Sequence, residues 1–152
     1  MRAIFLDFDG VLHPLPMQLS TNRVVRGKPV GRYAPVNFFC WLPILVGLLE
    51  SHNDVQVVVH STWRESRPAQ EIAAYLTSLG AKYVGCTIGG QKMTSIEHWL
   101  CEHPEIKSWR ILDDCPLAFD PRPLELIECH WAHGISDPDV SRQLAAWLQE
   151  SS

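Results

Sequence analysis

Near its beginning the chain reads Ile4-Phe5-Leu6-Asp7-Phe8-Asp9-Gly10-Val11. The apolar residues before Asp7 are typical of a buried strand, and we expect the first strand to cover residues 2–8. Where this strand ends, the two carboxylates of Asp7 and Asp9 can face the same side, with Phe8 between them pointing into the core. Because Asp and Gly both favour turns, an acidic turn without chemistry is the plain alternative.

Outward from this strand, short apolar runs alternate with amphipathic stretches. We expect further strands at residues 55–59, 83–86, 109–112 and 126–129. We expect helices at 36–51, at 68–79, after a cap at Thr94 or Ser95, and from Asp137-Pro138 onward. Such alternation indicates an α/β fold, a three-layer Rossmann-like sandwich with a parallel sheet of about five strands.

The length and composition indicate one ordinary globular domain over residues 1–152. The chain is 46% hydrophobic and 20% charged, which argues against disorder. Its net charge of −4 excludes a strongly basic nucleic-acid-binding domain. Residues 13–35 can form a small flap, with Val24-Val25 and Val30 as its β segments. A local basic cluster there is either a solvated loop or a substrate-facing surface: Arg23, Arg26, Lys28 and Arg32.

The sequence predicts a cytoplasmic protein with reduced cysteines. Five cysteines are present, an odd number, and no pair has Cys-x-x-Cys spacing. The acidic residues Asp7 and Asp9 come too early for a signal peptide, and the apolar stretch 38–49 is too short to span a membrane. The seven histidines show no spacing that would predict a zinc site. Of these, we expect His13, which follows the first acidic pair, to be the one that meets substrate.

Polar residues of the kinds used in phosphoryl transfer follow three of the expected strands. Asp7 and Asp9 follow the first strand, His60-Ser61-Thr62 the second, and Asp113-Asp114 the one at 109–112, while Lys92 precedes a helix. In an open parallel sheet, ligands bind outside the carboxyl ends of the strands. The sequence therefore predicts one site that gathers these residues.

These motifs resemble those of the haloacid dehalogenase (HAD) superfamily, in the same order along the chain. The segment 5–12 resembles the first motif, and Val57-Val58-Val59-His60-Ser61-Thr62 the second. Lys92 suits the third motif, and Ile111-Leu112-Asp113-Asp114 resembles the acidic fourth. Ser61-Thr62-Trp63-Arg64 is similar to the small HAD domains related to RNA-repair (Swiss Army Knife) proteins. The resemblance implies a HAD-type fold, and from the length of 152 residues we expect at most a small flap in place of a cap domain.

The chemistry of phosphoryl transfer gives these residues roles. A carboxylate nucleophile, Asp7, would form an aspartyl-phosphate, and Asp9 would act as general acid and then general base. Mg²⁺ would compensate the negative charge, and the resemblance implies Asp7, the Asp9 carbonyl and an acid of the fourth motif as ligands. We favour Asp114 for that ligand, with Asp113 behind it or bridged by water.

The remaining site residues would bind substrate, although each has a plainer interpretation. Ser61 and Lys92 would contact the phosphoryl oxygens, and Thr62 and Arg64 are further substrate-binding candidates. Ser61 or Thr62 could instead cap a helix, and Lys92 or Arg64 could be surface charges. Asp113-Asp114 could cap a helix before Pro116. For Trp63, packing is favoured over stacking on a base.

The predicted function is hydrolysis of a phosphomonoester, with Mg²⁺ as cofactor. The substrate is a phosphorylated small molecule or a nucleic-acid end, and no membrane or obligate protein partner is expected. A nucleic-acid end phosphatase is the rival within enzymes. A phosphate-accepting receiver domain is disfavoured because here the spaced acidic pair comes first and the adjacent pair late. A catalytically inactive phosphate-binding module remains an alternative.

Overall fold

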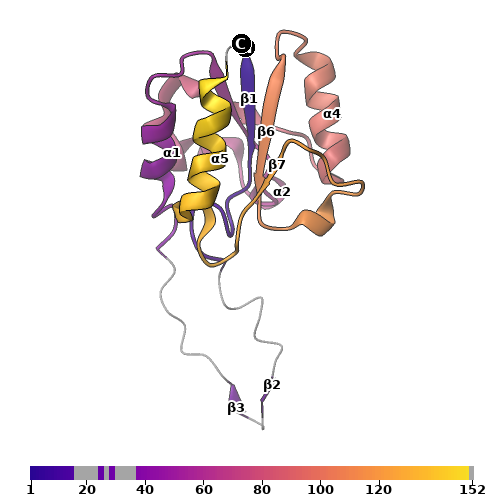
Figure 1. The fold of residues 1–152 in the computed structure, drawn as a ribbon. Helices are drawn as coiled ribbons and strands as arrows, with labels where there is room; N and C mark the ends of the chain where they lie inside the picture. The colour runs from indigo at the N-terminus through magenta and orange to yellow at the C-terminus, as the bar shows by residue number, and fades with distance from the viewer. Residues whose placement is uncertain (16–23, 26–27, 30–36, 151–152) are drawn as a thin grey trace.

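A computed structural model describes residues 1–15, 24–25, 28–29 and 37–150. Its main sheet has five strands in the order β5-β4-β1-β6-β7, and every pairing in it is parallel (Figure 1). The strands are β1 (Arg2–Leu6), β4 (Val55–Val59), β5 (Tyr83–Cys86), β6 (Ser108–Asp113) and β7 (Leu126–Glu128). The predicted α/β class and five-stranded parallel sheet are confirmed.

The first strand lies in the middle of the sheet because its sequence is apolar on both faces. All five residues of β1 are buried, as expected for a parallel strand that is covered on both sides. It pairs with β4 on one side and β6 on the other, so that Leu6 lies beside both Val59 and Leu112. The ends of these three strands therefore meet at one edge of the sheet.

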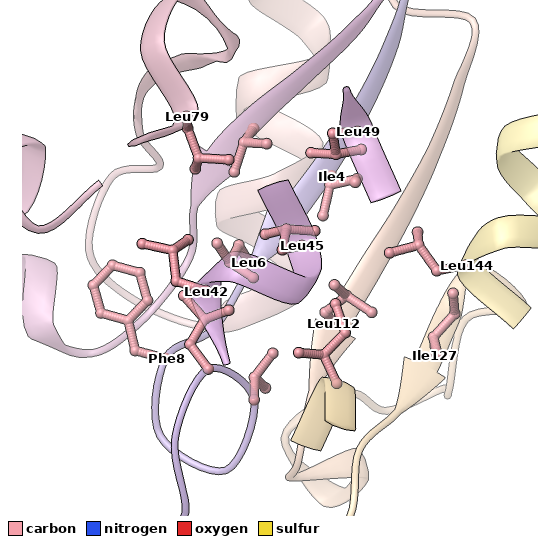
Figure 2. Close-up of a cluster of buried hydrophobic side chains, with 14 of the residues drawn as sticks. Ile4, Leu6, Phe8, Leu42, Leu45, Leu49, Leu79, Leu112, Ile127 and Leu144 are labelled. Carbon is pink, nitrogen blue, oxygen red and sulfur yellow. The ribbon is translucent and has the colours of Figure 1, made fainter. Parts of the chain in front are cut away.

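Helices cover both faces of the sheet and produce three layers. The α-helices are α1 (Leu42–Leu49), α2 (Trp63–Ser66), α3 (Ala69–Tyr75), α4 (Lys92–Glu102) and α5 (Pro138–Gln149). Ile4 and Leu6 point to the face covered by α1, α3 and α5, where the larger core cluster lies (Figure 2). Ala3 and Phe5 point to the other face, against Ile96 and Trp99 of α4.

Several boundaries differ from the sequence-based expectations. The first helix begins at Leu42 rather than near residue 36, because the chain turns at Phe39, whose φ is +60°. The helix expected at 68–79 divides into α3 and a 3-10 segment, η2 (Thr77–Lys82), with a kink at Gly80. Two further 3-10 segments are η3 (Pro116–Ala118) and η4 (Gly134–Ser136).

The largest consequence for the site comes from α4. Thr94 and Ser95 do not cap this helix, which begins at Lys92 with Gln91 before it. Inside the helix the Ser95 hydroxyl donates to the Gln91 carbonyl at 2.9 Å. Lys92 therefore lies in the first turn, at the end of the helix that faces the site.

Only part of the segment 13–35 falls within the described residues. There, β2 (Val24–Val25) pairs antiparallel with β3 (Lys28–Pro29). Val30 and the basic residues Arg23, Arg26 and Arg32 lie outside the described residues, and the flap stays a prediction. Among the helices that are described, none combines the length and apolarity needed to cross a membrane.

Candidate active site

The site begins where three adjacent strands end. Asp7 follows β1, and its backbone N–H donates to the Leu112 carbonyl of β6 at 3.0 Å. The N–H of His60, at the end of β4, donates to the Leu6 carbonyl at 2.8 Å. Asp113 is the last residue of β6. The sheet therefore brings the first, second and fourth motifs to one place, as their order predicted.

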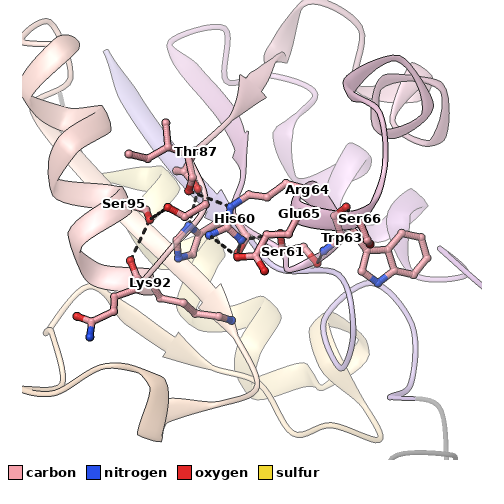
Figure 3. A network of polar contacts seen from close by, with 12 residues as sticks. His60, Ser61, Trp63, Arg64, Glu65, Ser66, Thr87, Lys92 and Ser95 are labelled. Carbon is pink, nitrogen blue, oxygen red and sulfur yellow. Dashed lines mark hydrogen bonds and ion pairs between the residues drawn. The ribbon is translucent and has the colours of Figure 1, made fainter.

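Lys92 reaches this edge of the sheet from the first turn of α4. Its ammonium lies 2.9 Å from Asp7 Oδ2 and also contacts Asp113 Oδ2. Figure 3 shows Lys92 and Ser95 coming from α4, and His60, Ser61 and Arg64 from the end of β4 and α2. Only 13% of the Lys92 side chain is exposed, which excludes the surface interpretation.

Three carboxylates gather around this ammonium. One oxygen from each of Asp7, Asp113 and Asp114 lies within 4.8 Å of the other two. Burial and repulsion by Asp7 raise the pKa of Asp113, against the opposing charge of Lys92. The same two causes raise the pKa of Asp114 to about 6. Burial alone would lower the pKa of Lys92, but Asp7 and Asp113 outweigh it and raise that pKa.

The two adjacent acids differ in what they already contact. Asp113 is fully buried, and its Oδ1 accepts from the Cys115 N–H at 2.9 Å while Oδ2 accepts from Lys92. Asp114 is half-buried and has no side-chain hydrogen bond to another described residue. Of the two, Asp114 is thus the one whose carboxylate oxygens lie beside Asp7 without a hydrogen bond to another side chain of the described residues.

Gly10 is required for Asp114 to lie there. Its φ is +70°, in the region that side chains disfavour, and a Cβ built on it would lie 2.3 Å from Asp114 Oδ2. Any other residue at position 10 would push the Asp114 carboxylate away from the cluster. The Asp-x-Asp-Gly pattern therefore has a spatial reason beyond turn formation.

The residues of the second motif and those just after it differ in burial and in contacts. Ser61 is buried directly after β4, and its hydroxyl accepts a long hydrogen bond from the Trp63 N–H at 3.4 Å. Thr62 is exposed and makes no side-chain cap, although it is the cap residue of α2. Only 4% of the Arg64 side chain is exposed, so Arg64 is not a surface charge.

The guanidinium of Arg64 donates hydrogen bonds to backbone carbonyls. Nη1 donates to the Ser61 carbonyl at 2.6 Å and to the His60 carbonyl at 3.2 Å, while Nε donates to the Ile88 carbonyl at 3.1 Å. Nη2 is buried without a hydrogen bond to any described residue. Arg64 thus ties the end of β4 to the loop before α4, and its predicted substrate contact stays a prediction.

Sequence reasoning missed two neighbours of Asp9. The buried ring of His13 lies with Nε2 2.8 Å from Asp9 Oδ1, and the Trp63 indole N–H donates to Asp9 Oδ2 at 2.9 Å. Burial alone would raise the pKa of Asp9, but these two hydrogen bonds, together with nearby positive charge such as that of Arg67, outweigh it and lower that pKa. His13 is fully buried with its ring against Asp9, and its expected contact with substrate stays a prediction. The prediction that Trp63 is a packing residue left out the hydrogen bond of its indole N–H.

The residues present fit a divalent cation with oxygen ligands. Three partly or fully buried carboxylates lie together and one ammonium contacts two of them, so the cluster carries excess negative charge. Such an all-oxygen set is the kind that Mg²⁺ prefers. Among the described residues, no other group of three His, Cys, Asp or Glu side chains converges in this way.

Comparison with known families agrees with this geometry. A family model described as "HAD domain in Swiss Army Knife RNA repair proteins" matches residues 3–140. The chain belongs to this family of HAD domains. The match includes all four motifs and extends into α5. No curated protein matches the chain. Membership in a HAD family indicates a HAD-type hydrolase and supports the α/β fold already described.

Proposed function

We propose that this HAD domain is a Mg²⁺-dependent phosphomonoester hydrolase that acts through an aspartyl-phosphate on Asp7. The observation that supports it most is the contact of the Lys92 ammonium with Asp7, inside a cluster of three carboxylates at the ends of β1 and β6. An ammonium placed against the nucleophile can also neutralise a phosphoryl group that approaches it.

The proposed reaction has two displacements at phosphorus. Asp9 enters the first displacement protonated: an Asp7 oxygen bonds to phosphorus while the bond to the leaving oxygen breaks, and Asp9 gives its proton to that oxygen. A water molecule then attacks the phosphorus as Asp9 takes its proton, which releases phosphate and restores the Asp7 carboxylate. When bound, Mg²⁺ would supply charge neutralisation, held by Asp7, Asp114 and the Asp9 carbonyl.

Asp7→Asn tests this proposal directly. A panel of phosphomonoesters is assayed with Mg²⁺, and we expect the wild type to release phosphate and Asp7→Asn to lose at least about a hundredfold in kcat. Glu102→Gln is the matched control, because it also removes one negative charge but lies exposed at the far end of α4. If Asp7→Asn matched the wild type on every active substrate, the mechanism would be wrong.

A nucleic-acid end phosphatase is the second candidate. It is favoured by the description of the matching family, which refers to RNA repair. Phosphorylated oligonucleotides are compared with sugar phosphates at low and high salt. Preference for the oligonucleotide, with binding that weakens steeply as salt rises, would support this candidate. Equal activity on sugar phosphates at both salt concentrations would contradict it.

A further inference from the structure

The carboxylate of Asp9 is held at both of its oxygens. Oδ1 lies 2.8 Å from His13 Nε2, and Oδ2 accepts from the Trp63 indole N–H at 2.9 Å. Each carboxylate oxygen has two lone pairs, and among the described residues only one donor contacts each oxygen. About 23% of the Asp9 side chain is exposed. The carboxylate is therefore fixed in orientation and still accessible.

The donor on His13 is determined by its second ring nitrogen. His13 Nδ1 accepts a hydrogen bond from the Phe39 backbone N–H at 3.2 Å. In a neutral ring, an accepting Nδ1 places the proton on Nε2, which then donates to Asp9. Phe39 can present its N–H here because its backbone has a φ of +60°, an uncommon conformation for a side-chain-bearing residue.

Aromatic packing holds the indole of Trp63 equally firmly. Its ring meets Phe8 and Phe39 edge to face, with centroids 5.6 Å and 5.5 Å away. The Arg67 guanidinium lies 4.4 Å from the centre of the indole. Trp63 is also the first residue of α2, directly after Ser61-Thr62. The helix that follows the second motif thus places a hydrogen-bond donor, the Trp63 indole N–H, against Asp9 of the first motif.

We propose that His13 and Trp63 are positioning residues for Asp9, which hold its carboxylate where it can exchange a proton with the leaving oxygen and with water. This inference rests on the proposed function. Both donors are ring N–H groups, and each ring is fixed by contacts on the side away from Asp9. Neither residue needs to contact the substrate, since its effect passes through Asp9.

Trp63→Phe removes one donor and keeps an aromatic ring. With an alkyl phosphate, whose leaving oxygen needs a proton, we expect kcat to fall at least roughly tenfold while KM stays within about twofold. We expect a smaller loss with p-nitrophenyl phosphate in the first displacement, and a burst of p-nitrophenolate, because water attack on the aspartyl-phosphate becomes slow. We expect His13→Gln, which keeps a donor, to retain more activity than His13→Leu.

A double-mutant cycle separates positioning from general damage. In an Asp9→Asn background, we expect Trp63→Phe to cause no further loss in kcat, because its effect passes through the missing carboxylate. Trp109→Phe is the matched control, since the buried Trp109 Nε1 makes no hydrogen bond with the described residues. The inference would be overturned if the two losses multiplied, or if Trp63→Phe left kcat unchanged on an active enzyme.

A second measurement does not depend on turnover. The indole N–H signal of Trp63 in a ¹H–¹⁵N correlation spectrum should shift upfield in Asp9→Ala, and that of Trp109 should not. An unchanged Trp63 signal would disprove the contact and overturn the inference alone. A wild type that hydrolyses no phosphomonoester would instead overturn the proposed function, and with it the catalytic part of this inference.

Discussion

Asp114 shows at the scale of one residue how the site balances its charges. Its carboxylate lies beside Asp7 and against the bare Cα of Gly10, and burial together with repulsion by Asp7 raises its pKa to about 6. A carboxyl group whose pKa is raised by folding favours the protonated form in the folded protein. Without a cation, this group therefore contributes less to stability as the pH rises through about 6.

This charge balance predicts a pH-dependent response to Mg²⁺. Near pH 7.5 Asp114 is ionised and a cation relieves its repulsion, whereas near pH 5 protons occupy the same oxygens. We expect Mg²⁺ to raise the Tm in a thermal unfolding assay clearly more at about pH 7.5 than at about pH 5. Asp114→Asn should lose most of this increase at the higher pH. An equal increase at both pH values would contradict the assignment.

At the scale of elements, the site depends on how the end of β4 is joined to α4. Arg64 of α2 donates to the Ser61 carbonyl after β4 and to the Ile88 carbonyl in the loop before α4. In that same loop, Thr87 Oγ1 lies 2.8 Å from His60 Nδ1. The position of Lys92 against Asp7 follows from these contacts, because Lys92 begins α4 directly after the loop. Burial, helped by the charges of Arg64 and Lys92, lowers the pKa of His60 to about 3, so this ring stays neutral.

Arg64→Met tests this join. The substitution keeps the apolar stem and leaves three backbone carbonyls without the guanidinium, and we expect the free energy of unfolding to fall by about 1–3 kcal/mol. Activity should also fall, because Lys92 is held less well. Arg142→Met is the control, since 72% of the Arg142 side chain is exposed. Urea unfolding that gave equal stabilities for the two variants would argue against the join.

For the whole molecule, α5 completes the layer that covers β6 and β7. Its Trp147 is buried in the larger core cluster, and the indole N–H donates to Ser108 Oγ of β6 at 2.8 Å. The Arg2 guanidinium contacts the same ring and donates to the Trp147 and Leu148 carbonyls at 3.0 Å. The C-terminal helix is thereby fixed to the first residue of the central strand.

Trp147→Ala measures how much the sheet depends on this helix. We expect the free energy of unfolding in urea to fall by about 3–5 kcal/mol, because a large buried ring is replaced by a cavity. Trp131→Ala makes the same chemical change at a side chain that is 45% exposed, and it should cost far less. Similar losses from the two variants would show that α5 does not carry this share of stability.

Much of the fold and of the candidate site could be predicted because the signals are local. The strands at 55–59 and 83–86 agree with β4 and β5, and Asp137 caps α5 as expected, accepting from the Asp139 N–H at 2.8 Å. The polar residues at the expected strand ends also predicted that Asp7 and Asp113 lie at one site. The predicted helix starts near residue 36 and after Thr94 or Ser95 were wrong, because contacts distant in sequence determine where α1 and α4 begin.

The sequence by itself determined the parallel sheet, the family resemblance and the acidic groups at its carboxyl edge, because apolar periodicity and strand ends are read along the chain. Only the tertiary structure decided how Asp9 is held, since His13, Phe39 and Trp63 come from three separate segments. It likewise decided that Asp114 lies against Gly10 while Asp113 is bound to Lys92. Hydrogen bonds of single side chains depend on packing in three dimensions, which no short sequence pattern specifies.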